Sequence, residues 1–310
     1  MRILFVGAGA TGGYFGGRLA GAGRDVTFLV RPNRAAALAE RGLRIAGPDG
    51  EITVQPHVIT AGEIDRPYDV VVVAIKSYAL EQAMLDMAPA VGPRTVVVPL
   101  LNGMRHVDEM VGAFGEEHVY GGVCMIHATL DDAGDVMQLT GLHRLGFGPL
   151  DGDDDGRLKA VTEALSGAGF DSKPSATIVQ DMWEKWMFLA GLGAATTLMR
   201  ATVGAINAAP GGPAFMAGIA DEVVSVAGAA GHRPRDGAAA FLRAGVSSTA
   251  PTTSSLYRDM AQGLPVEADA IVGDFVTEAE NRGVRTPLLS AAYTQLSIYA
   301  AGRSGASAGR

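Results

Sequence analysis

The sequence predicts an α/β protein, in which an N-terminal, doubly wound and mostly parallel sheet precedes a C-terminal all-helical domain. Short β-branched runs alternate with helical patterns through the first half of the chain, which is typical of βαβ units. After the acidic segment 151–155 the periodicity is almost purely helical. Because 310 residues exceed the usual size of a single hydrophobic core, we expect two domains, residues 1–176 and residues 177–310.

The first strand, Arg2 to Val6, runs directly into a G-x-G-x-x-G motif that opens an Ala/Gly-rich helix over residues 11–22. This order is typical of a Rossmann-type unit, which holds the pyrophosphate of a dinucleotide on the amide groups of the helix N-terminus. Gly7 would permit the tight turn, Gly9 a close backbone approach to phosphate, and Gly12 close packing of the helix on the sheet. A chain with 42 glycines could contain the motif by chance as a plain turn, but its place between two strands favours a nucleotide site. The residues expected to bind the cofactor here are Gly7, Ala8, Gly9, Ala10, Thr11 and Gly12.

The end of the second strand, residues 25–30, indicates which nucleotide binds. NAD-selective sites carry Asp or Glu there, about 20 residues beyond the glycines, to accept hydrogen bonds from the ribose 2′-hydroxyl. This chain instead has Arg31 and Arg34, whose planar, permanently charged donors suit a 2′-phosphate. Arg34 could equally be a solvated loop residue, so Arg31 is the better candidate, and we expect the cofactor to be NADP(H).

The remaining elements follow from local patterns. The valine-rich segment 68–76 does not alternate, which is typical of a parallel strand buried on both faces. In the first half we also expect helices at 33–41 and 79–87, a hairpin at 42–56, and strands at 95–101, 119–126, 136–140 and 144–147. In the second half we expect helices at 157–168, 178–199, 213–230, 236–245, 264–282 and 287–299, and a frayed tail at 301–310.

The composition excludes several classes of function. A net charge of −8 argues against nucleic acid or an anionic membrane as the main partner, because both require a basic surface. The single cysteine, Cys124, excludes an internal disulfide and a cysteine-based metal site, so we expect no metal and a cytoplasmic location. The N-terminus lacks the features of a signal peptide, and we expect the apolar segment 186–199 to be a buried helix and not a membrane span.

Two polar residues follow buried strands of the predicted sheet. Lys76 ends the valine-rich strand, and Asn102 follows the next strand, just before Gly103. The lysine could be a solvated strand end, and the Asn-Gly pair could be a plain turn. Ligands of doubly wound sheets bind at the carboxyl ends of the strands, however, so the presence of both residues at corresponding ends favours an active site there.

The helical half offers a second set of polar residues. Lys185 lies among aromatic and apolar residues, where a desolvated lysine could donate a proton to a developing alkoxide. The alternative is a lysine whose stem merely covers apolar surface. Ser255 and Glu267 lie on either side of a Gly-Leu-Pro break, and Glu267 could simply occupy the first turn of a helix.

Taken together, these residues resemble the ketopantoate reductase (2-dehydropantoate 2-reductase) family. The resemblance spans nearly the whole chain, because its motifs occur in the expected order in both halves: the glycine motif, Arg31, Ile75-Lys76, Asn102-Gly103-Met104, Trp183-x-Lys185, Ser254-Ser255-Leu256 and Glu267. It implies NADPH-dependent reduction of the 2-oxo group of ketopantoate to pantoate, which leads to pantothenate and coenzyme A. The substrate would be a small 2-oxo acid.

The resemblance also implies a role for each residue. In the cofactor site, Gly7 to Gly12 would hold the pyrophosphate, Arg31 the 2′-phosphate, and Lys76 the ribose and phosphate. Asn102 would lie between nicotinamide and substrate. Lys185 would be the general acid that protonates the substrate oxygen and stabilises the developing alkoxide. Ser255 would bind the substrate carboxylate, and Glu267 would bind the substrate hydroxyl and orient the lysine.

One departure from the family pattern concerns the substrate. Family members typically carry asparagines one and two turns beyond the catalytic lysine, whereas this chain has Leu189 and Gly193. Each lost hydrogen bond to a polar substrate group costs about 1 kcal/mol. Three functions therefore stay open: a ketopantoate reductase, a reductase of the same mechanism acting on a more apolar 2-oxo acid, and a non-catalytic NADPH-binding redox sensor. Retention of Lys185 and Glu267 speaks against the sensor, and the long apolar helices could pack within a monomer or across a homodimer.

Overall fold

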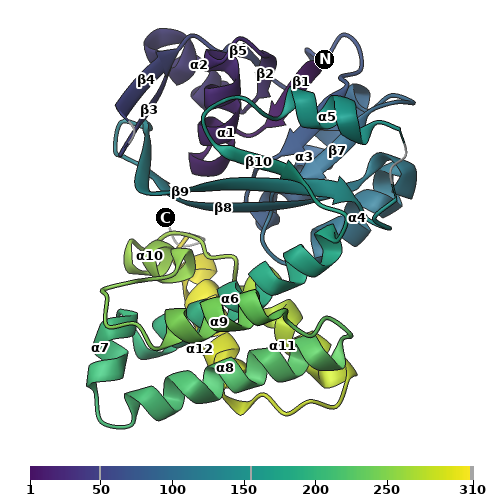
Figure 1. Ribbon diagram of the computed structural model, residues 1–310. Coiled ribbons are helices and arrows are strands. Elements are labelled where there is room, and N and C mark those ends of the chain that lie inside the picture. The colour runs from purple at the N-terminus through teal and green to yellow at the C-terminus, as the bar shows by residue number, and fades with distance from the viewer. Residues whose placement is uncertain (49, 154–155, 308–310) are drawn as a thin grey trace. The chain divides into compact units, whose positions relative to one another are not determined.

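The computed structural model divides the chain into two compact units, one α/β and one helical (Figure 1). The α/β unit comprises Met1–Leu101 and His106–Val179. The helical unit comprises Gln180–Arg310 together with the short segment Asn102–Arg105. The predicted fold class, a parallel sheet followed by an all-helical part, is confirmed.

The structure describes residues 1–48, 50–153 and 156–307. Asp154 and Asp155, from the predicted acidic turn, lie outside the described residues, as do residues 308–310 of the predicted tail.

A five-stranded parallel sheet forms the centre of the α/β unit. Its strands lie in the order β5-β2-β1-β6-β7. Phe5 of β1 is aligned with Phe28 of β2 and with Val72 of β6, and all three side chains are fully buried. The expected valine-rich strand is therefore confirmed as one buried on both faces. The strands are β1 (Arg2–Val6), β2 (Asp25–Leu29), β5 (His57–Ile59), β6 (Val70–Val73) and β7 (Val96–Pro99).

A second, mixed sheet belongs to the same unit. It contains the predicted hairpin, β3 with β4, and a long antiparallel pair, β8 with β9. We expected two strands at 136–140 and 144–147, but β9 is one strand whose pairing with β8 is interrupted between Gln138 and His143. The break in the sequence pattern therefore marks an irregularity and not a strand end. The strands are β3 (Leu43–Gly47), β4 (Gly50–Val54), β8 (Tyr120–Leu130), β9 (Val136–Pro149) and β10 (Asp171–Pro174).

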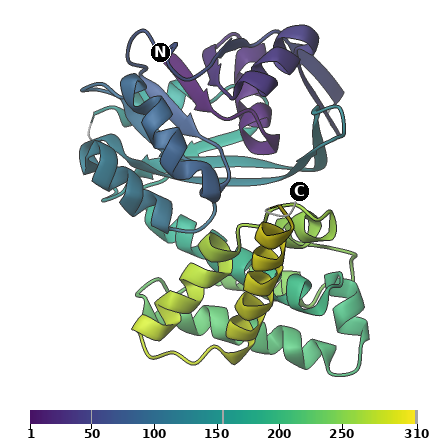
Figure 2. The same ribbon diagram turned by 180° about the vertical axis from the view of Figure 1, so that it is seen from behind.

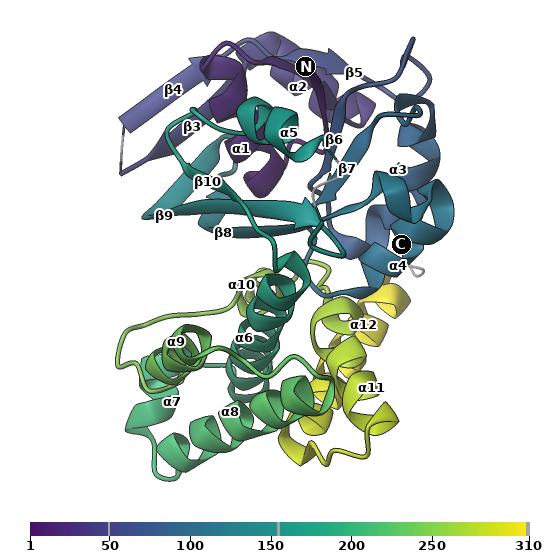
Figure 3. The same ribbon diagram turned by 45° about the vertical axis from the view of Figure 1, so that its right-hand side comes forward.

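Helix α1 (Ala10–Gly21) contacts strands of both sheets (Figure 3). Its glycines make this possible. A Cβ atom at Gly16 would lie 2.7 Å from the ring of Phe28 in the first sheet. A Cβ atom at Gly17 would lie 2.7 Å from Ile45 Cδ1 in the second sheet. The helix is thus confined from two sides, and this fixes where its N-terminus lies.

Among the other helices of the α/β unit, α2 and α3 match the prediction to within one residue, whereas α4 and α5 differ from it. Helix α4 follows β7 and was not predicted, although Val107, Met110 and Phe114 repeat at helical spacing. Helix α5 ends four residues before the predicted Ala168, ahead of Gly167, whose φ of +76° is incompatible with a helix. These helices are α2 (Pro32–Arg41), α3 (Leu80–Met87), α4 (Arg105–Phe114) and α5 (Leu158–Ala164), with 3₁₀ turns η1 (Ser77–Ala79), η2 (Ala88–Ala90) and η3 (Glu116–His118).

The helical unit is arranged around α6, which spans Ile178–Met199 as predicted. Helix α12, yellow in Figure 2, packs on α8 and on the turn η4. Helices α7 and α10 are additional to the prediction, and α12 continues to Ser307 where we expected a frayed tail. None of the helices in the described part of the chain is long and apolar enough to span a membrane. The elements are α7 (Val203–Ala208), α8 (Gly212–Ala229), α9 (Asp236–Val246), α10 (Ser255–Ala261), η4 (Asp269–Gly273), α11 (Asp274–Asn281) and α12 (Pro287–Ser307).

We predict that Gly16→Ala destabilises the protein by about 1–3 kcal/mol, because the added methyl overpacks the rings of Phe28 and Phe5. Gly21→Ala in the same helix is the matched control. Its Cβ would lie 3.4 Å from Val54, an ordinary contact, so the better helix propensity of Ala should leave stability equal or slightly higher. Urea unfolding of both variants measures the difference, and equal free energies of unfolding would contradict this packing.

Candidate functional site

The glycine turn joins β1 to α1 through close contacts between backbone atoms. Gly7 has a φ of +97°, and its amide donates to the carbonyl of Leu29 at 2.9 Å. A Cβ atom at Gly7 would lie 2.7 Å from the carbonyl oxygen of Ala74, and one at Gly12 would collide with the carbonyl oxygen of Gly7. Ala74 follows β6, so the turn is packed against the end of two neighbouring strands. Side chains are excluded at both glycines for the reasons expected from the motif.

Gly9 differs from the other two glycines because it faces open space. A Cβ atom there would meet nothing within 4 Å. Gly9 is the N-cap of α1, and no side chain of the described residues caps the helix there. Amide groups of the first turn, at Ala10 and Thr11, are thus presented beside an unobstructed backbone, together with the positive end of the helix dipole. The residues fit a bound pyrophosphate.

Arg31 and Arg34 occupy different environments at the start of α2. Arg31 is the N-cap residue of α2 and is exposed. Arg34 is half-buried, and both its Nε and Nη2 groups donate to the carbonyl of Ala8, at 3.2 and 3.0 Å. Burial lowers the pKa of the Arg34 guanidinium and Arg41 adds to this effect, while Asp135 opposes it. The guanidinium of Arg34 is therefore held directly against the glycine turn, although the sequence favoured Arg31 as the residue that binds the 2′-phosphate.

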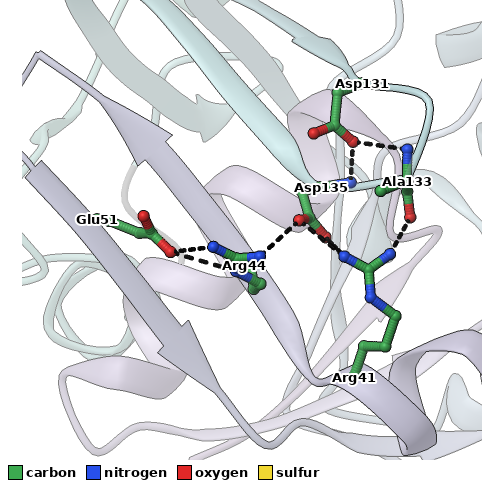
Figure 4. A network of polar contacts seen from close by, with 6 residues as sticks. All are labelled: Arg41, Arg44, Glu51, Asp131, Ala133 and Asp135. Atoms are coloured by element: carbon green, nitrogen blue, oxygen red, sulfur yellow. Dashed lines mark hydrogen bonds and ion pairs between the residues drawn. The ribbon is translucent and has the colours of Figure 1, made fainter.

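A polar network fixes the turn between β8 and β9 (Figure 4). Its members are Arg41, Arg44, Glu51, Asp131, Ala133 and Asp135. Asp131 closes the turn by accepting from the amide of Asp135 at 2.8 Å. Arg41 of α2 donates to both carboxylate oxygens of Asp135, and Arg44 of β3 pairs with it at 3.3 Å. Gly134 lies in this turn, where a Cβ atom would come within 2.7 Å of Arg34 Nη1. Arg41 and Arg44 thus both contact Asp135 and hold the turn that lies beside Arg34.

Lys76 follows strand β6, and the end of this strand packs against the glycine turn. It is half-buried and is the N-cap of η1. It lies two residues after Ala74, whose Cβ would be 3.0 Å from a Cβ at Gly12. The structure therefore brings Gly7, Gly12, Arg34 and the strand end that carries Lys76 to one edge of the sheet.

Lys185 and Glu267 both belong to the helical unit. Lys185 is half-buried on α6, and Glu267 is only 4% exposed, just before η4. The next residue on α6, Trp186, donates its indole N–H to the carbonyl of Ile271 at 3.0 Å, and the amide of Ile271 donates to the carbonyl of Glu267 at 3.2 Å. The segments that carry the lysine and the glutamate are thus directly joined.

Asn102 is half-buried in the short segment that packs with the helical unit. The following residue, Gly103, has a φ of +88°, and a Cβ atom there would collide with the carbonyl oxygen of Ala270. Arg105 forms an ion pair with the buried Asp274. Asn102 is therefore held beside the same turn, η4, that follows Glu267.

Ser255 is the first residue of α10. Ser254 caps this helix by accepting from the amide of Tyr257 at 3.0 Å, and it is 2.7 Å from Thr196 Oγ1, which ties α10 to α6. Arg258, one turn beyond Ser255, is half-buried and donates to the carbonyl of Thr253 at 3.1 Å. Burial lowers the pKa of this guanidinium, with Asp259 opposing. A cation close to the start of α10 was not singled out from the sequence, although the i, i+3 spacing from Ser255 could have indicated it.

The face of α6 beyond the lysine is apolar. Leu189 and Gly193 lie one and two turns from Lys185 on the same face. Gly193 is buried, and a Cβ atom there would lie 2.8 Å from Leu256 Cδ1. The space that the family's second asparagine would occupy is therefore bordered by a leucine of α10.

Comparison with known proteins identifies the family. A family model described as ketopantoate reductase PanE/ApbA matches residues 3–152, and one described as ketopantoate reductase PanE/ApbA C terminal matches residues 177–300. The chain is 37% identical over 303 residues to the uncharacterized oxidoreductase YkpB of Bacillus subtilis, covering 97% of this chain and 99% of that protein. It is 29% identical over 298 residues to a 2-dehydropantoate 2-reductase of Halobacterium salinarum, covering 93% and 95%.

Solved structures share the fold. A 2-dehydropantoate 2-reductase from Geobacter metallireducens matches with a TM-score of 0.87 and 27% identity, covering 96% of this chain and 99% of that chain. D-mandelate dehydrogenase with NADH and anilino(oxo)acetate matches with a TM-score of 0.86 and 22% identity, covering 98% and 100%. The glycine turn, the lysine helix and these relatives agree, and the chain belongs to the ketopantoate reductase PanE/ApbA family of oxidoreductases.

Proposed function

We propose that this protein is an NADP(H)-dependent reductase that converts a 2-oxo acid into the corresponding 2-hydroxy acid in the cytoplasm. The observation that carries the proposal is the joining of the Lys185 segment to the Glu267 segment in the helical unit, because carbonyl reduction requires a placed proton donor. The open glycine turn supports it, since the same reaction requires a nicotinamide cofactor. The first substrate we propose is ketopantoate, which would place the enzyme in pantothenate and coenzyme A synthesis.

In this proposal the two arginines select NADP(H). The β2 end offers guanidinium groups and no carboxylate, which favours a 2′-phosphate over a free ribose hydroxyl. Arg34 is already held at the glycine turn, and Arg31 is exposed at the strand end, where it could close on the phosphate. D-mandelate dehydrogenase, which has the same fold, carries NADH, so the fold itself does not decide between the two nucleotides.

The proposed chemistry divides between the cofactor and the chain. Bound NADPH would supply a hydride to the 2-carbon of the acid. Lys185 would donate the proton to the oxo oxygen and stabilise the charge that develops there. Glu267 would orient the ammonium group, and Asn102 would hold the substrate carbonyl by a hydrogen bond. Ser255 would bind the carboxylate at the start of α10, where Arg258 adds a positive charge.

A second candidate substrate is a 2-oxo acid with an apolar side chain. Leu189 and Gly193 replace two hydrogen-bonding residues, and Leu256 borders the second position, so these two positions of α6 offer no side-chain hydrogen bond to a substrate hydroxyl. D-mandelate dehydrogenase, which shares the fold, was solved with anilino(oxo)acetate, an oxo acid that carries an aromatic group, and this supports the second candidate. Rates of NADPH oxidation with ketopantoate, 2-oxoisovalerate and phenylglyoxylate decide between the two candidates. A kcat/KM for ketopantoate no better than for 2-oxoisovalerate would exclude ketopantoate as the physiological substrate.

We predict that Lys185→Ala lowers kcat by about 10²–10⁴-fold, because it removes the proton donor, while the affinity for NADPH changes little. Stopped-flow rates and NADPH fluorescence titration measure the two quantities. The control is Lys159→Ala, which removes an exposed lysine of α5. Tight NADPH binding in both variants and in the parent protein, with no turnover of any 2-oxo acid by the parent, would instead favour a redox sensor.

We predict that Arg31→Ala and Arg34→Ala each raise the KM for NADPH by about tenfold or more and leave the KM for NADH nearly unchanged, because a charged hydrogen bond contributes about 1.5–3 kcal/mol. Arg94→Ala is the matched control. Arg94 precedes β7 and so lies at the amino ends of the parallel strands, whereas the glycine turn lies at their carboxyl ends. A parallel loss for both nucleotides would show that these arginines do not read the 2′-phosphate.

We predict that Leu189→Asn raises kcat/KM for ketopantoate relative to 2-oxoisovalerate by about fivefold, the equivalent of one hydrogen bond worth about 1 kcal/mol. Met199→Asn, at the exposed end of the same helix, should leave the ratio unchanged. The ratio is measured by competition between the two acids. An unchanged ratio in Leu189→Asn would mean that this face of α6 does not contact the substrate.

A further inference from the structure

A π-helical turn, η4, follows Glu267 in the helical unit. It spans Asp269–Gly273, and the amide of Asp274 donates to the carbonyl of Asp269, five residues earlier. Such turns are rare and frequently occur at functional sites. Because each hydrogen-bonded ring contains one extra residue, the carbonyls of η4 leave the regular α-helical register and can meet partners from other elements.

Trp186 provides the first of these partners. Its indole N–H donates to the carbonyl of Ile271 at 3.0 Å, and the side chain is 2% exposed. The ring also packs edge-on against Phe275, with centroids 4.7 Å apart. Since the backbone of Ile271 is hydrogen-bonded to that of Glu267, a single side chain connects the turn of α6 that carries Lys185 with the turn that carries Glu267.

The Asn102 segment provides the second contact with η4. Gly103 packs so closely on the carbonyl of Ala270 that no Cβ atom could be accommodated, and its φ of +88° also favours glycine. Ala270 and Ile271 are consecutive residues. Their carbonyls therefore meet Gly103 and Trp186, which are the immediate neighbours of two proposed site residues.

We infer that η4 supports the proposed catalytic groups and that Trp186 is a positioning residue. Trp186 fixes the position of Lys185 relative to Glu267 and Asn102. This inference rests on the proposed function. A regular α-helical turn would rotate the carbonyls of Ala270 and Ile271 away from their present partners. A lysine side chain has four rotatable bonds, so its ammonium group can adopt many positions that miss the substrate. A fixed backbone at Lys185 and at the neighbouring site residues reduces the number of such positions.

Trp183 distinguishes a positioning role from a merely structural one. It lies one turn earlier on α6, is 7% exposed, and packs in the same aromatic cluster, 5.0 Å from the ring of Trp186 and 6.3 Å from that of Phe275. Trp183→Phe therefore perturbs the same core without removing the bond to η4. Trp186→Phe keeps an aromatic ring against Phe275 but removes the donor to Ile271.

The test compares Trp186→Phe, Trp183→Phe and Lys185→Ala in the full-length protein, with ketopantoate and 2-oxoisovalerate as substrates. We expect Trp186→Phe to lower kcat by about tenfold or more, with little change in KM and in the NADPH dissociation constant. The primary isotope effect with NADPH deuterated at the transferred position should increase, because hydride transfer becomes more rate-limiting. Trp183→Phe should stay within about twofold of the parent protein in each quantity.

Hydrogen exchange gives a readout that is independent of turnover. Amides within residues 267–275 should exchange faster in Trp186→Phe than in Trp183→Phe. Equal exchange and equal kcat in the two variants would overturn the inference. If Lys185→Ala retains full activity, the proposed function fails instead, whatever the tryptophan variants do.

Gly103→Ala tests the same support from its other side, should Trp186→Phe fold poorly. The added Cβ would displace the Asn102 segment from Ala270, so kcat should fall while NADPH still binds. Gly112→Ala in α4, where a Cβ atom would meet nothing within 4 Å, is its control. Equal kcat in these two variants would likewise overturn the inference.

Discussion

The start of α1 lies so close to the ends of β1 and β6 that backbone atoms pack directly on backbone atoms. Gly7 and Gly12 allow this, and Gly16 and Gly17 continue it along the helix between the two sheets. The consequence is chemical, because the first amide groups of α1 are held in one place without a capping side chain from the described residues. Everything proposed for the nucleotide depends on that fixed N-terminus.

The helical unit holds charged groups in an apolar environment. Glu267 is buried, and the helix beside it carries two tryptophans and a lysine. Burial of a carboxylate is costly unless polar partners are placed around it. Hydrogen bonds from Trp186 to the carbonyl of Ile271 and from the amide of Ile271 to the carbonyl of Glu267 hold in place the backbone that carries this carboxylate. A reductase must hold its proton donor in place and still admit a cofactor. The hydrogen-bonded backbone around Glu267 meets the first requirement, and the open space at Gly9 meets the second.

Sequence patterns predicted those parts of the structure that depend on local sterics. The glycine turn, the valine-rich strand and α6 follow from residues close in sequence, and the structure has all three. Strand β10 could not be predicted, because its residues Asp171 to Pro174 resemble a turn and become a strand only by pairing with β9. The π-helical turn could not be predicted either, because an apolar pattern of period 3.6 does not distinguish it from an α-helix. Arg34 shows the same limit in the site: its place depends on Ala8 and on a turn at Gly134, 100 residues away in sequence.

Gly193 and Leu256 also constrain how this enzyme could change over evolutionary time. An asparagine at position 193 needs room that Leu256 fills, so the exchange at 193 is costly until residue 256 becomes smaller. A smaller residue at 256 on its own leaves a void between α6 and α10. Each substitution alone is thus expected to lower stability, and the two together are expected to lower it less than the sum of their separate effects. Residues 193 and 256 are therefore expected to change together and not one at a time.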